Sequence, residues 1–238
     1  MVSLEGDQKR RYVADLFGNI ARRYDFMNTL MTGGMHHGWR RRAVEKAATS
    51  NHGLALDIGT GTGDLALALA KIHPITGVVG VDLVPTMVSL AYDKACQKAT
   101  NTPVSFLVGD ALSLPFPDDT FACATSAFLL RNVPDLKMSL EEMVRVVQPG
   151  GKVILLEIMP LERGALVPLF RLYFHRIVPF MGALISRDPE AYTYLPKSVD
   201  GFLSTESLRE LLQEVGLQDV GYNRMGLGTV VLYWGTMG

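Results

Sequence analysis

The chain alternates short, nearly continuous apolar stretches with helical stretches, and this order restricts the folds open to it. Stretches of strand character occupy residues 53–59, 78–83, 104–110, 121–130 and 152–158. Helical patterns lie between them, and Pro85 begins one at a first-turn position where proline is tolerated. Apolar strands that alternate with helices indicate a parallel sheet covered on both faces. The sequence therefore predicts an α/β fold whose ligands bind beyond the carboxyl ends of the strands.

The segments around this pattern suggest how the chain is divided. Residues 8–48 have a helical pattern with a Gly-rich break at 32–34, so we expect residues 1–50 to form an N-terminal helical lid. Residues 160–200 interrupt the alternation with a dense apolar and aromatic segment, after which a helix (205–215) and two closing strands (217–224, 228–235) are expected. With 238 residues, 48% of them hydrophobic, the chain can bury one sizeable core. We expect a single domain over 51–238 with an insertion at about 160–200.

Charge and cysteine content exclude several classes of protein. The net charge is −1, so no global field favours nucleic acid, although residues 1–46 carry an excess of four positive charges. Cys96 and Cys123 are far apart and match no metal or redox spacing, which favours a reduced, cytoplasmic protein without a metal site. The longest uncharged run, 225–238, has 14 residues and is too short to span a bilayer. The N-terminus lacks an apolar signal core.

The stretch LDIGTGTGD, residues 56–64, follows the first strand and begins the first helix. Its glycines, Gly59, Gly61 and Gly63, allow a tight turn and a close approach of a ligand to the backbone. A dinucleotide fingerprint would need glycine where Asp64 stands, and an acid at a helix N-terminus disfavours a pyrophosphate. Asp57, just before the loop, suits a cationic ligand.

Acidic residues also end the next two strands. The Asp82 carboxylate can accept hydrogen bonds from both ribose hydroxyls, and Asp110 can accept one from an adenine amino group. A ribose, an adenine and a positive charge without phosphate describe S-adenosyl-L-methionine. The alternative is an ordinary tight turn with solvated acids at the strand ends. The cofactor-binding residues that we predict are Asp57, Gly59, Gly61, Thr62, Asp82, Leu83, Asp110 and Ala111.

Three stretches resemble signatures of the ubiquinone/menaquinone biosynthesis C-methyltransferase family. They are RYDFMNTLMTGGMHHGW (23–39), LRNVPD (130–135) and YTYLPKSV (192–199). The resemblance implies a Rossmann-like class I methyltransferase fold, with a seven-stranded, mostly parallel sheet and helices on both faces. It also implies C-methylation of a polyprenylated quinol by S-adenosyl-L-methionine, most closely demethylmenaquinol to menaquinol. The alternative substrate is 2-methoxy-6-polyprenyl-1,4-benzoquinol of ubiquinone biosynthesis.

The chemistry of that reaction suggests roles for the second signature. An oxidised quinone is too electron-poor to attack a sulfonium, whereas a reduced ring can attack when a hydroxyl beside the target carbon is deprotonated. The site must then stabilise a developing oxyanion, and the guanidinium of Arg131 stays charged at any working pH. Asn132 can hold a water or the second ring oxygen. The alternative for Arg131 is a structural ion pair with Asp135 or Asp110.

The first signature supplies a candidate base for the proton that leaves the methylated carbon. His36 matches the family's histidine, and the neighbouring His37 could serve instead. The alternative for His36 is a surface residue beside a Gly-rich turn. The substrate-contacting residues implied by the resemblance are Tyr24, Asn28, Trp39, Phe128 and Tyr194.

Two positions depart from the family pattern S-F-G-L-R-N. Ala127 replaces the serine, and Ser126 should point to the opposite face of the strand. Leu129 replaces the glycine, so we expect a bulkier wall where the substrate ring binds.

The insertion suggests where a prenyl tail is bound. Its stretch 161–187 contains four arginines and one glutamate among apolar and aromatic residues, a composition typical of segments that lie on anionic lipid. Peripheral contact with the inner face of a membrane is therefore one expectation. The alternative is a buried helical insertion, or a contact between two copies in a homodimer. Two other functions stay open: a methyltransferase for a soluble small molecule, and a paralogue that binds S-adenosyl-L-methionine or a quinol without turnover.

Overall fold

A seven-stranded sheet organises the chain in the computed structural model, which describes residues 6–48, 52–72, 74–98, 100–161, 167–185 and 189–238. The strand order is β3-β2-β1-β4-β5-β7-β6. Strand β7 runs antiparallel to the other six strands, which are parallel to one another. This arrangement confirms the predicted Rossmann-like methyltransferase fold. The strands are β1 (Gly53–Ile58), β2 (Ile75–Asp82), β3 (Val104–Val108), β4 (Phe121–Ala127), β5 (Val147–Ile158), β6 (Leu217–Met225) and β7 (Val230–Met237).

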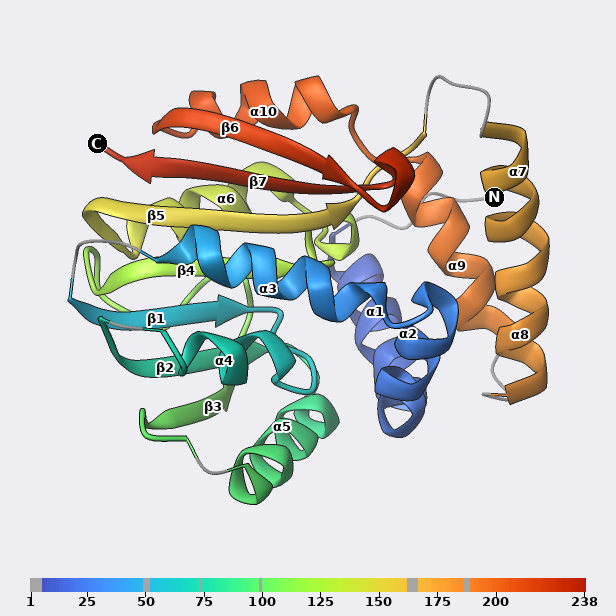
Figure 1. The fold of residues 1–238 in the computed structure, drawn as a ribbon, viewed down its shortest axis with the longest axis horizontal. Helices are drawn as coiled ribbons and strands as arrows, with labels where there is room; N and C mark the ends of the chain where they lie inside the picture. The colour runs from blue at the N-terminus through green and yellow to red at the C-terminus, as the bar shows by residue number, and fades with distance from the viewer. Residues whose placement is uncertain (1–5, 49–51, 73, 99, 162–166, 186–188) are drawn as a thin grey trace.

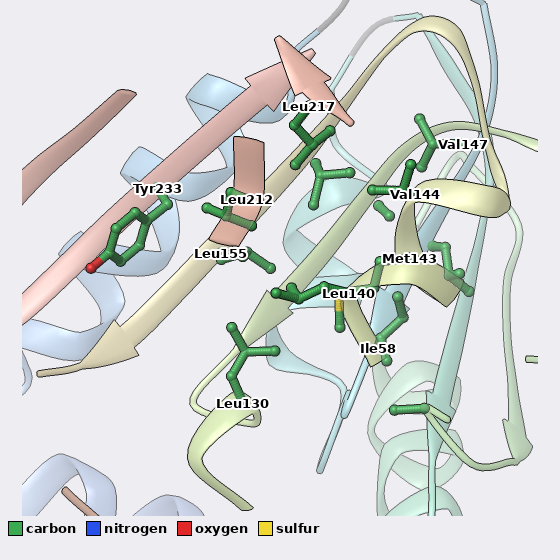
Figure 2. Packing of buried hydrophobic residues seen from close by; sticks show 14 of the residues in the cluster. Ile58, Leu130, Leu140, Met143, Val144, Val147, Leu155, Leu212, Leu217 and Tyr233 are labelled. Atoms are coloured by element: carbon green, nitrogen blue, oxygen red, sulfur yellow. The ribbon is translucent and has the colours of Figure 1, made fainter. Parts of the chain in front are cut away.

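Helices cover both faces of the sheet because alternate strand residues point to opposite sides. In β1, Leu56 and Ile58 pack in one buried cluster, and Ala55 packs in the other. Figure 2 shows the first cluster, in which the sheet meets α6 (Leu136–Arg145) and α10 (Thr205–Glu214). The second cluster includes α3 (Met35–Ala47) and α4 (Asp64–Leu69), and α5 (Pro85–Gln97) contacts β2 and β3. Proline stands at the start of α5, as the sequence predicted.

The N-terminal helices and the insertion gather beyond the carboxyl ends of the parallel strands (Figure 1). Leu16 and Met27 from the N-terminal helices pack there against Phe174, Val178 and other buried residues of the insertion. The sheet thus carries a helical layer at the edge where ligands of such folds bind. The elements of this layer are α1 (Gly6–Ile20), α2 (Tyr24–Thr32), α7 (Val167–Leu172), a π-helical turn η3 (Tyr173–Ile177), α8 (Val178–Ile185) and α9 (Pro189–Asp200).

The fourth strand ends earlier than its apolar sequence predicted. It stops at Ala127, and Phe128 adopts a positive φ of 63° that ends the extended conformation. Residues Leu130–Asn132 then form a 3₁₀ turn, η2, in which Leu130 is buried in the core. Residues 121–126 and Leu130 of the apolar run are buried, whereas residues 127–129 are partly buried and lead into a turn. Arg131 and Asn132 lie on this turn and not at a strand tip.

Candidate functional site

A small pocket lies at the carboxyl ends of β1 and β2, and six of the eight predicted cofactor residues line it. They are Gly59, Gly61, Asp82, Leu83, Asp110 and Ala111. The pocket has a volume of about 90 Å³, below the roughly 300 Å³ at which ligand pockets usually start. Arg10 and Val13 of α1 also line it, so the N-terminal helix narrows the pocket.

The carboxylate of Asp82 lies against the glycine loop. Its Oδ2 accepts the backbone N–H of Gly61 at 2.7 Å, and its Oδ1 accepts that of Val84 at 2.9 Å. Burial raises the pKa of Asp82, and these two hydrogen bonds oppose the shift. Each carboxylate oxygen has lone pairs left for a ribose hydroxyl. The acid and the glycine loop together fit the ribose of S-adenosyl-L-methionine.

Asp110 faces the same pocket with a partner that the sequence did not reveal. Its Oδ1 accepts the N–H of Leu112 at 3.0 Å, and its Oδ2 lies 3.2 Å from Nε of Arg10 in an ion pair. Asp110 is therefore not the ion-pair partner of Arg131 that the sequence left open. An adenine amino group would share this carboxylate with Arg10.

The structure does not bring the other two predicted cofactor residues to the pocket wall. Asp57 is buried behind the loop, where it accepts hydrogen bonds from Thr60 at 2.7 Å and Thr125 at 2.9 Å. Burial raises the pKa of Asp57 to about 6, although these two hydrogen bonds act to lower it. Thr62 turns away and donates to Asp25 of α2 at 2.6 Å. Both residues shape the loop and do not face the pocket.

A polar network fastens the N-terminal helices to the loop and to α5. Nζ of Lys94 contacts Asp25 at 2.7 Å, Thr62 at 2.9 Å and Asp64 at 2.8 Å. Arg40 of α3 donates to the other oxygen of Asp64 at 2.9 Å. Asp64 is the residue that stands where a dinucleotide fingerprint would need glycine. From the start of α4, its carboxylate binds Arg40 of α3 and Lys94 of α5.

A larger cavity of about 500 Å³ lies between the sheet edge and the helical layer, and its lining is mainly apolar. Every residue predicted for catalysis or substrate contact lines it. They are Tyr24, Asn28, His36, Trp39, Phe128, Arg131, Asn132 and Tyr194. Side chains from α7, α8 and η3, including Leu169 and Val178, complete the wall. Residues of the insertion and of the three sequence signatures therefore line one cavity.

The two cavities share a wall. Phe17, Tyr24, Phe128 and Asn132 line both of them. Tyr24 lies over the glycine loop, since a Cβ at Gly61 would stand 3.9 Å from its ring, and the ring packs edge-on against Phe17. A group bound at the loop would therefore meet a molecule in the larger cavity at these residues.

Arg131 is buried and forms an ion pair, the alternative role named above, but its partner is neither Asp135 nor Asp110. Its Nη1 pairs with the carboxylate of Glu157 on β5 and donates to the carbonyl of Phe128 at 2.8 Å. Asp135 instead caps α6 by accepting the N–H of Met138. Nε of Arg131 has no hydrogen-bond partner within the described part of the chain.

Asn132 and Phe128 form a second part of this arrangement. Nδ2 of Asn132 donates to the carbonyl of Phe128 at 3.1 Å, and its Oδ1 has no partner within the described residues. The N–H of Phe128 donates to the carbonyl of Leu156 at 2.7 Å. Both backbone groups of Phe128 are therefore held, which keeps it in a left-handed conformation that side chains rarely adopt.

His36 is buried, with 2% of its surface exposed, and is not the surface residue of the alternative interpretation. Its Nδ1 lies 2.7 Å from Oγ1 of Thr32. Burial, with the positive charge of Arg40 and the neighbouring His37, lowers the pKa of His36 to about 4. The ring is thus neutral at neutral pH. His37 is exposed and does not line the cavity.

The two departures from the signature lie on the side of the smaller pocket. Ala127 and Leu129 line that pocket and not the larger cavity. Leu129 has an ordinary φ of −94°, and its side chain packs on Gly59, where an added Cβ would lie 2.9 Å away. The expected bulkier wall around the substrate ring is therefore not found. Ser126 points away, as predicted, and donates to the carbonyl of Ile58.

Comparisons with known proteins agree with this geometry. A sequence model described as the ubiE/COQ5 methyltransferase family matches residues 5–237. The chain belongs to this family. A demethylmenaquinone methyltransferase of Roseiflexus castenholzii is 43% identical, over 96% of this chain and 94% of the relative. A ubiquinone/menaquinone biosynthesis C-methyltransferase UbiE of Geobacter sulfurreducens is 38% identical, over 97% of this chain and 90% of the relative.

A solved structure supports the fold. An S-adenosylmethionine-dependent methyltransferase of Thermotoga maritima superposes with a TM-score of 0.65 at 22% identity, covering 95% of this chain and all of the other. Membership of the ubiE/COQ5 methyltransferase family identifies the protein as a methyltransferase, and the glycine loop with Asp82 fits S-adenosyl-L-methionine as its methyl donor. Among the described residues, no helix is both long and apolar enough to cross a bilayer.

Sequence reasoning missed several residues that build the site of this family member. Glu157 gave a signal, since it is the one charged residue in the apolar stretch ILLEI. Lys94 and Arg10 gave none, because their partners are distant in the sequence and surface helices commonly carry such residues. Phe17 also gave none, since an aromatic residue on a helix usually packs in the core.

Proposed function

We propose that this methyltransferase methylates a ring carbon of a polyprenylated quinol, with demethylmenaquinol as the substrate and menaquinol as the product. One observation carries the proposal. All eight residues predicted for catalysis and substrate contact line a single apolar cavity of about 500 Å³ that shares four wall residues with the pocket at the glycine loop. When bound at that loop, S-adenosyl-L-methionine supplies the electrophilic methyl group. The relatives named for demethylmenaquinone and for ubiquinone/menaquinone methylation support the substrate class.

Arg131 and Asn132 would bind the polar part of the ring. The cavity wall is mainly apolar, yet Nε of Arg131 and Oδ1 of Asn132 are buried there without partners in the described chain. Arg131 and Asn132 are also among the polar side chains in this mainly apolar wall, which favours a polar ligand group at this place. The guanidinium charge would stabilise the oxyanion that develops beside the reacting carbon, and Asn132 would hold a ring oxygen or a water.

His36 would take the proton that leaves the methylated carbon. The imidazole of His36 is neutral at neutral pH because its pKa is lowered to about 4, so it can accept a proton. A base this weak suffices for the step, since loss of that proton restores the aromatic ring. Thr32 holds Nδ1 of the ring at 2.7 Å and fixes its orientation.

The mouth of the cavity suggests how a long tail leaves it. Leu169, Leu172, Ile177 and Leu227 line the cavity and are also exposed, Leu227 by 81% and Leu169 by 64%. Exposed apolar side chains that rim a cavity mark a site of contact with lipid or with another apolar partner. The ring and the first part of the tail would occupy the cavity, and the remaining tail would pass over this rim.

We propose that the same rim rests on an anionic membrane surface. Phe180 and Leu184 extend the exposed apolar face of α8, and Arg171 and Arg176 are exposed on α7 and η3. Apolar residues beside arginines favour binding at an anionic interface. Arg163, Arg187 and Glu162, which were counted in the sequence, lie outside the described residues. A contact between two copies of the chain is the competing use of this face.

Complementation tests the proposed substrate. The gene is expressed in bacterial strains that lack either the menaquinone or the ubiquinone C-methylation step, and the accumulated quinones are measured by mass spectrometry. Restored menaquinone with loss of demethylmenaquinone is expected. Restoration of ubiquinone alone would assign the benzoquinol instead. Restoration of neither by a folded protein that binds S-adenosyl-L-methionine would favour a soluble substrate or a non-catalytic paralogue.

A further inference from the structure

Glu157 is the least exposed charged group beside the larger cavity, with 0% of its surface exposed. It lines neither cavity, so it does not contact a bound substrate or cofactor directly. One carboxylate oxygen accepts the N–H of Ile158 at 2.8 Å, which anchors the group to β5. The carboxylate is therefore fixed to the sheet and directed at the η2 turn.

Apart from this bond to Ile158, the hydrogen bonds of Glu157 in the described chain are made with Arg131. Oε1 pairs with Nη1 of the guanidinium, and Oε2 lies 3.4 Å from the backbone N–H of the same residue. The carbonyl of Arg131 accepts Nζ of Lys9 from α1 at 3.3 Å. The backbone and the side chain of Arg131 are therefore both held by Glu157 and Lys9, which do not line the cavity. These contacts set the direction of the guanidinium.

The same guanidinium is one of three groups that hold the backbone of Phe128, with Asn132 and Leu156. Nη1 donates to the carbonyl of Phe128 at 2.8 Å, and Phe128 keeps a φ of 63° that costs conformational energy. Such a conformation persists only where surrounding contacts enforce it. Phe128 is part of the wall that the two cavities share. A shift of Arg131 would therefore move this wall as well.

We infer that Glu157 is a positioning residue for methyl transfer: through its ion pair with Arg131 it sets both the guanidinium that faces the substrate and the backbone of Phe128 between the two cavities. The inference rests on the proposed function, because the reaction it serves is the methylation of the quinol ring. It predicts that Glu157 acts only through Arg131. A carboxylate that merely stabilised the fold would not show this dependence.

A double-mutant cycle tests the inference. The single-turnover rate is measured with saturating S-adenosyl-L-methionine and a reduced short-chain demethylmenaquinone, for the parent, Glu157→Gln, Arg131→Gln and the double variant. Glu157→Gln should slow the parent by about a hundredfold, as small misplacements at reacting groups can. It should not slow Arg131→Gln any further. Affinity for S-adenosylhomocysteine, measured by calorimetry, should change much less than the rate, since Glu157 acts on that pocket only indirectly, through Arg131 and the backbone of Phe128.

Two further variants keep the test decisive. Glu157→Gln leaves a buried arginine unpaired and can prevent folding. Glu157→Asp keeps the charge but withdraws the carboxylate by one methylene, and it should also slow single turnover. Glu142→Gln is the matched control, because Glu142 pairs with Arg145 at 2.7 Å and lines neither cavity. It should lower the melting temperature and leave single turnover unchanged.

The outcomes separate this inference from the proposed function. Equal slowing by Glu157→Gln in the parent and in Arg131→Gln would overturn the inference, as would parent-like turnover of folded Glu157→Gln and Glu157→Asp. In either case an active parent leaves the proposed function standing. A folded parent that binds S-adenosyl-L-methionine and methylates no quinol would overturn both.

Discussion

The carboxylate of Asp82 accepts the backbone N–H of Gly61 at 2.7 Å, so the end of β2 sets the shape of the glycine loop. The same carboxylate lines the smaller pocket, which gives it two tasks. It holds the loop, and it faces the place where the ribose of the cofactor would bind.

Replacing Asp82 should therefore weaken cofactor binding. We expect Asp82→Ala to reduce the affinity for S-adenosyl-L-methionine by about 2–3 kcal/mol, since hydrogen bonds to a charged group contribute about that much. Isothermal titration calorimetry measures the change. Asp93→Ala is the control, because Asp93 is exposed on α5 and lines no described cavity. Unchanged affinity in Asp82→Ala would remove the residue from the cofactor site.

Loosening the N-terminal helices should speed the exchange of cofactor. Asp25 of α2 accepts hydrogen bonds from Thr62 of the loop and from Lys94. Asp25→Ala removes both, and we expect S-adenosylhomocysteine to dissociate about fivefold faster, the effect of about 1 kcal/mol from a partly exposed contact. Stopped-flow fluorescence measures the rate. Asp15→Ala, an exposed position on α1, is the control. An unaltered rate in Asp25→Ala would argue against α2 as part of a lid.

His36 should make stability depend on pH. The pKa of His36 is about 4 in the folded protein and about 6.5 in an unfolded chain, so the unfolded chain binds more protons between these values. Its contribution is present above pH 6.5 and is lost as the pH falls toward 4, an effect on the order of 2–3 kcal/mol. Urea unfolding at pH 7.5 and pH 4.5 should show a smaller loss in His36→Gln than in the parent.

The apolar rim should bind anionic vesicles weakly and in a salt-sensitive way. Surface attraction of about 1 kcal/mol per basic residue at low salt fades as salt is added. We expect co-sedimentation with phosphatidylglycerol vesicles at low salt and less at high salt. Phe180→Ser, 68% exposed in the parent, should weaken it, whereas Tyr92→Ser, 62% exposed on α5, should not. No co-sedimentation at low salt, together with a dimer in solution, would assign the face to a contact between copies.

The sequence predicted the sheet well because its central strands, β1, β4 and β5, are apolar and mostly buried, and its turns carry glycine and proline. Asp82 and Asp110 line the same pocket because the ends of parallel strands meet at one edge. Asp57 also precedes the loop, but its side chain points into the fold toward Thr60 and Thr125. The pattern of a strand does not reveal whether a residue near its end faces a cavity or the interior of the fold.

The signatures brought the cavity residues together, but they did not reveal how Arg131 is held. Its partner, Glu157, is 26 positions away on β5, and only the pairing of β4 with β5 brings the two close. The sequence predicted a longer fourth strand and not the turn at Phe128, because apolar residues in a buried turn have the same pattern as apolar residues in a buried strand. The lid role of residues 1–50 stays a prediction, and α3, its last helix, packs in the core of the sheet.

The requirement for a reduced ring tests the central claim most directly. Methyl transfer from S-adenosyl-L-methionine carrying a labelled methyl group is measured with a short-chain demethylmenaquinone held fully reduced or fully oxidised, and the quinones are analysed by mass spectrometry. Under the proposed function, the guanidinium, the amide and the neutral imidazole that line the cavity would surround a ring that must donate electrons, so the labelled menaquinone should form only from the reduced substrate. Equal labelling of the oxidised quinone under strictly oxidising conditions would contradict the account.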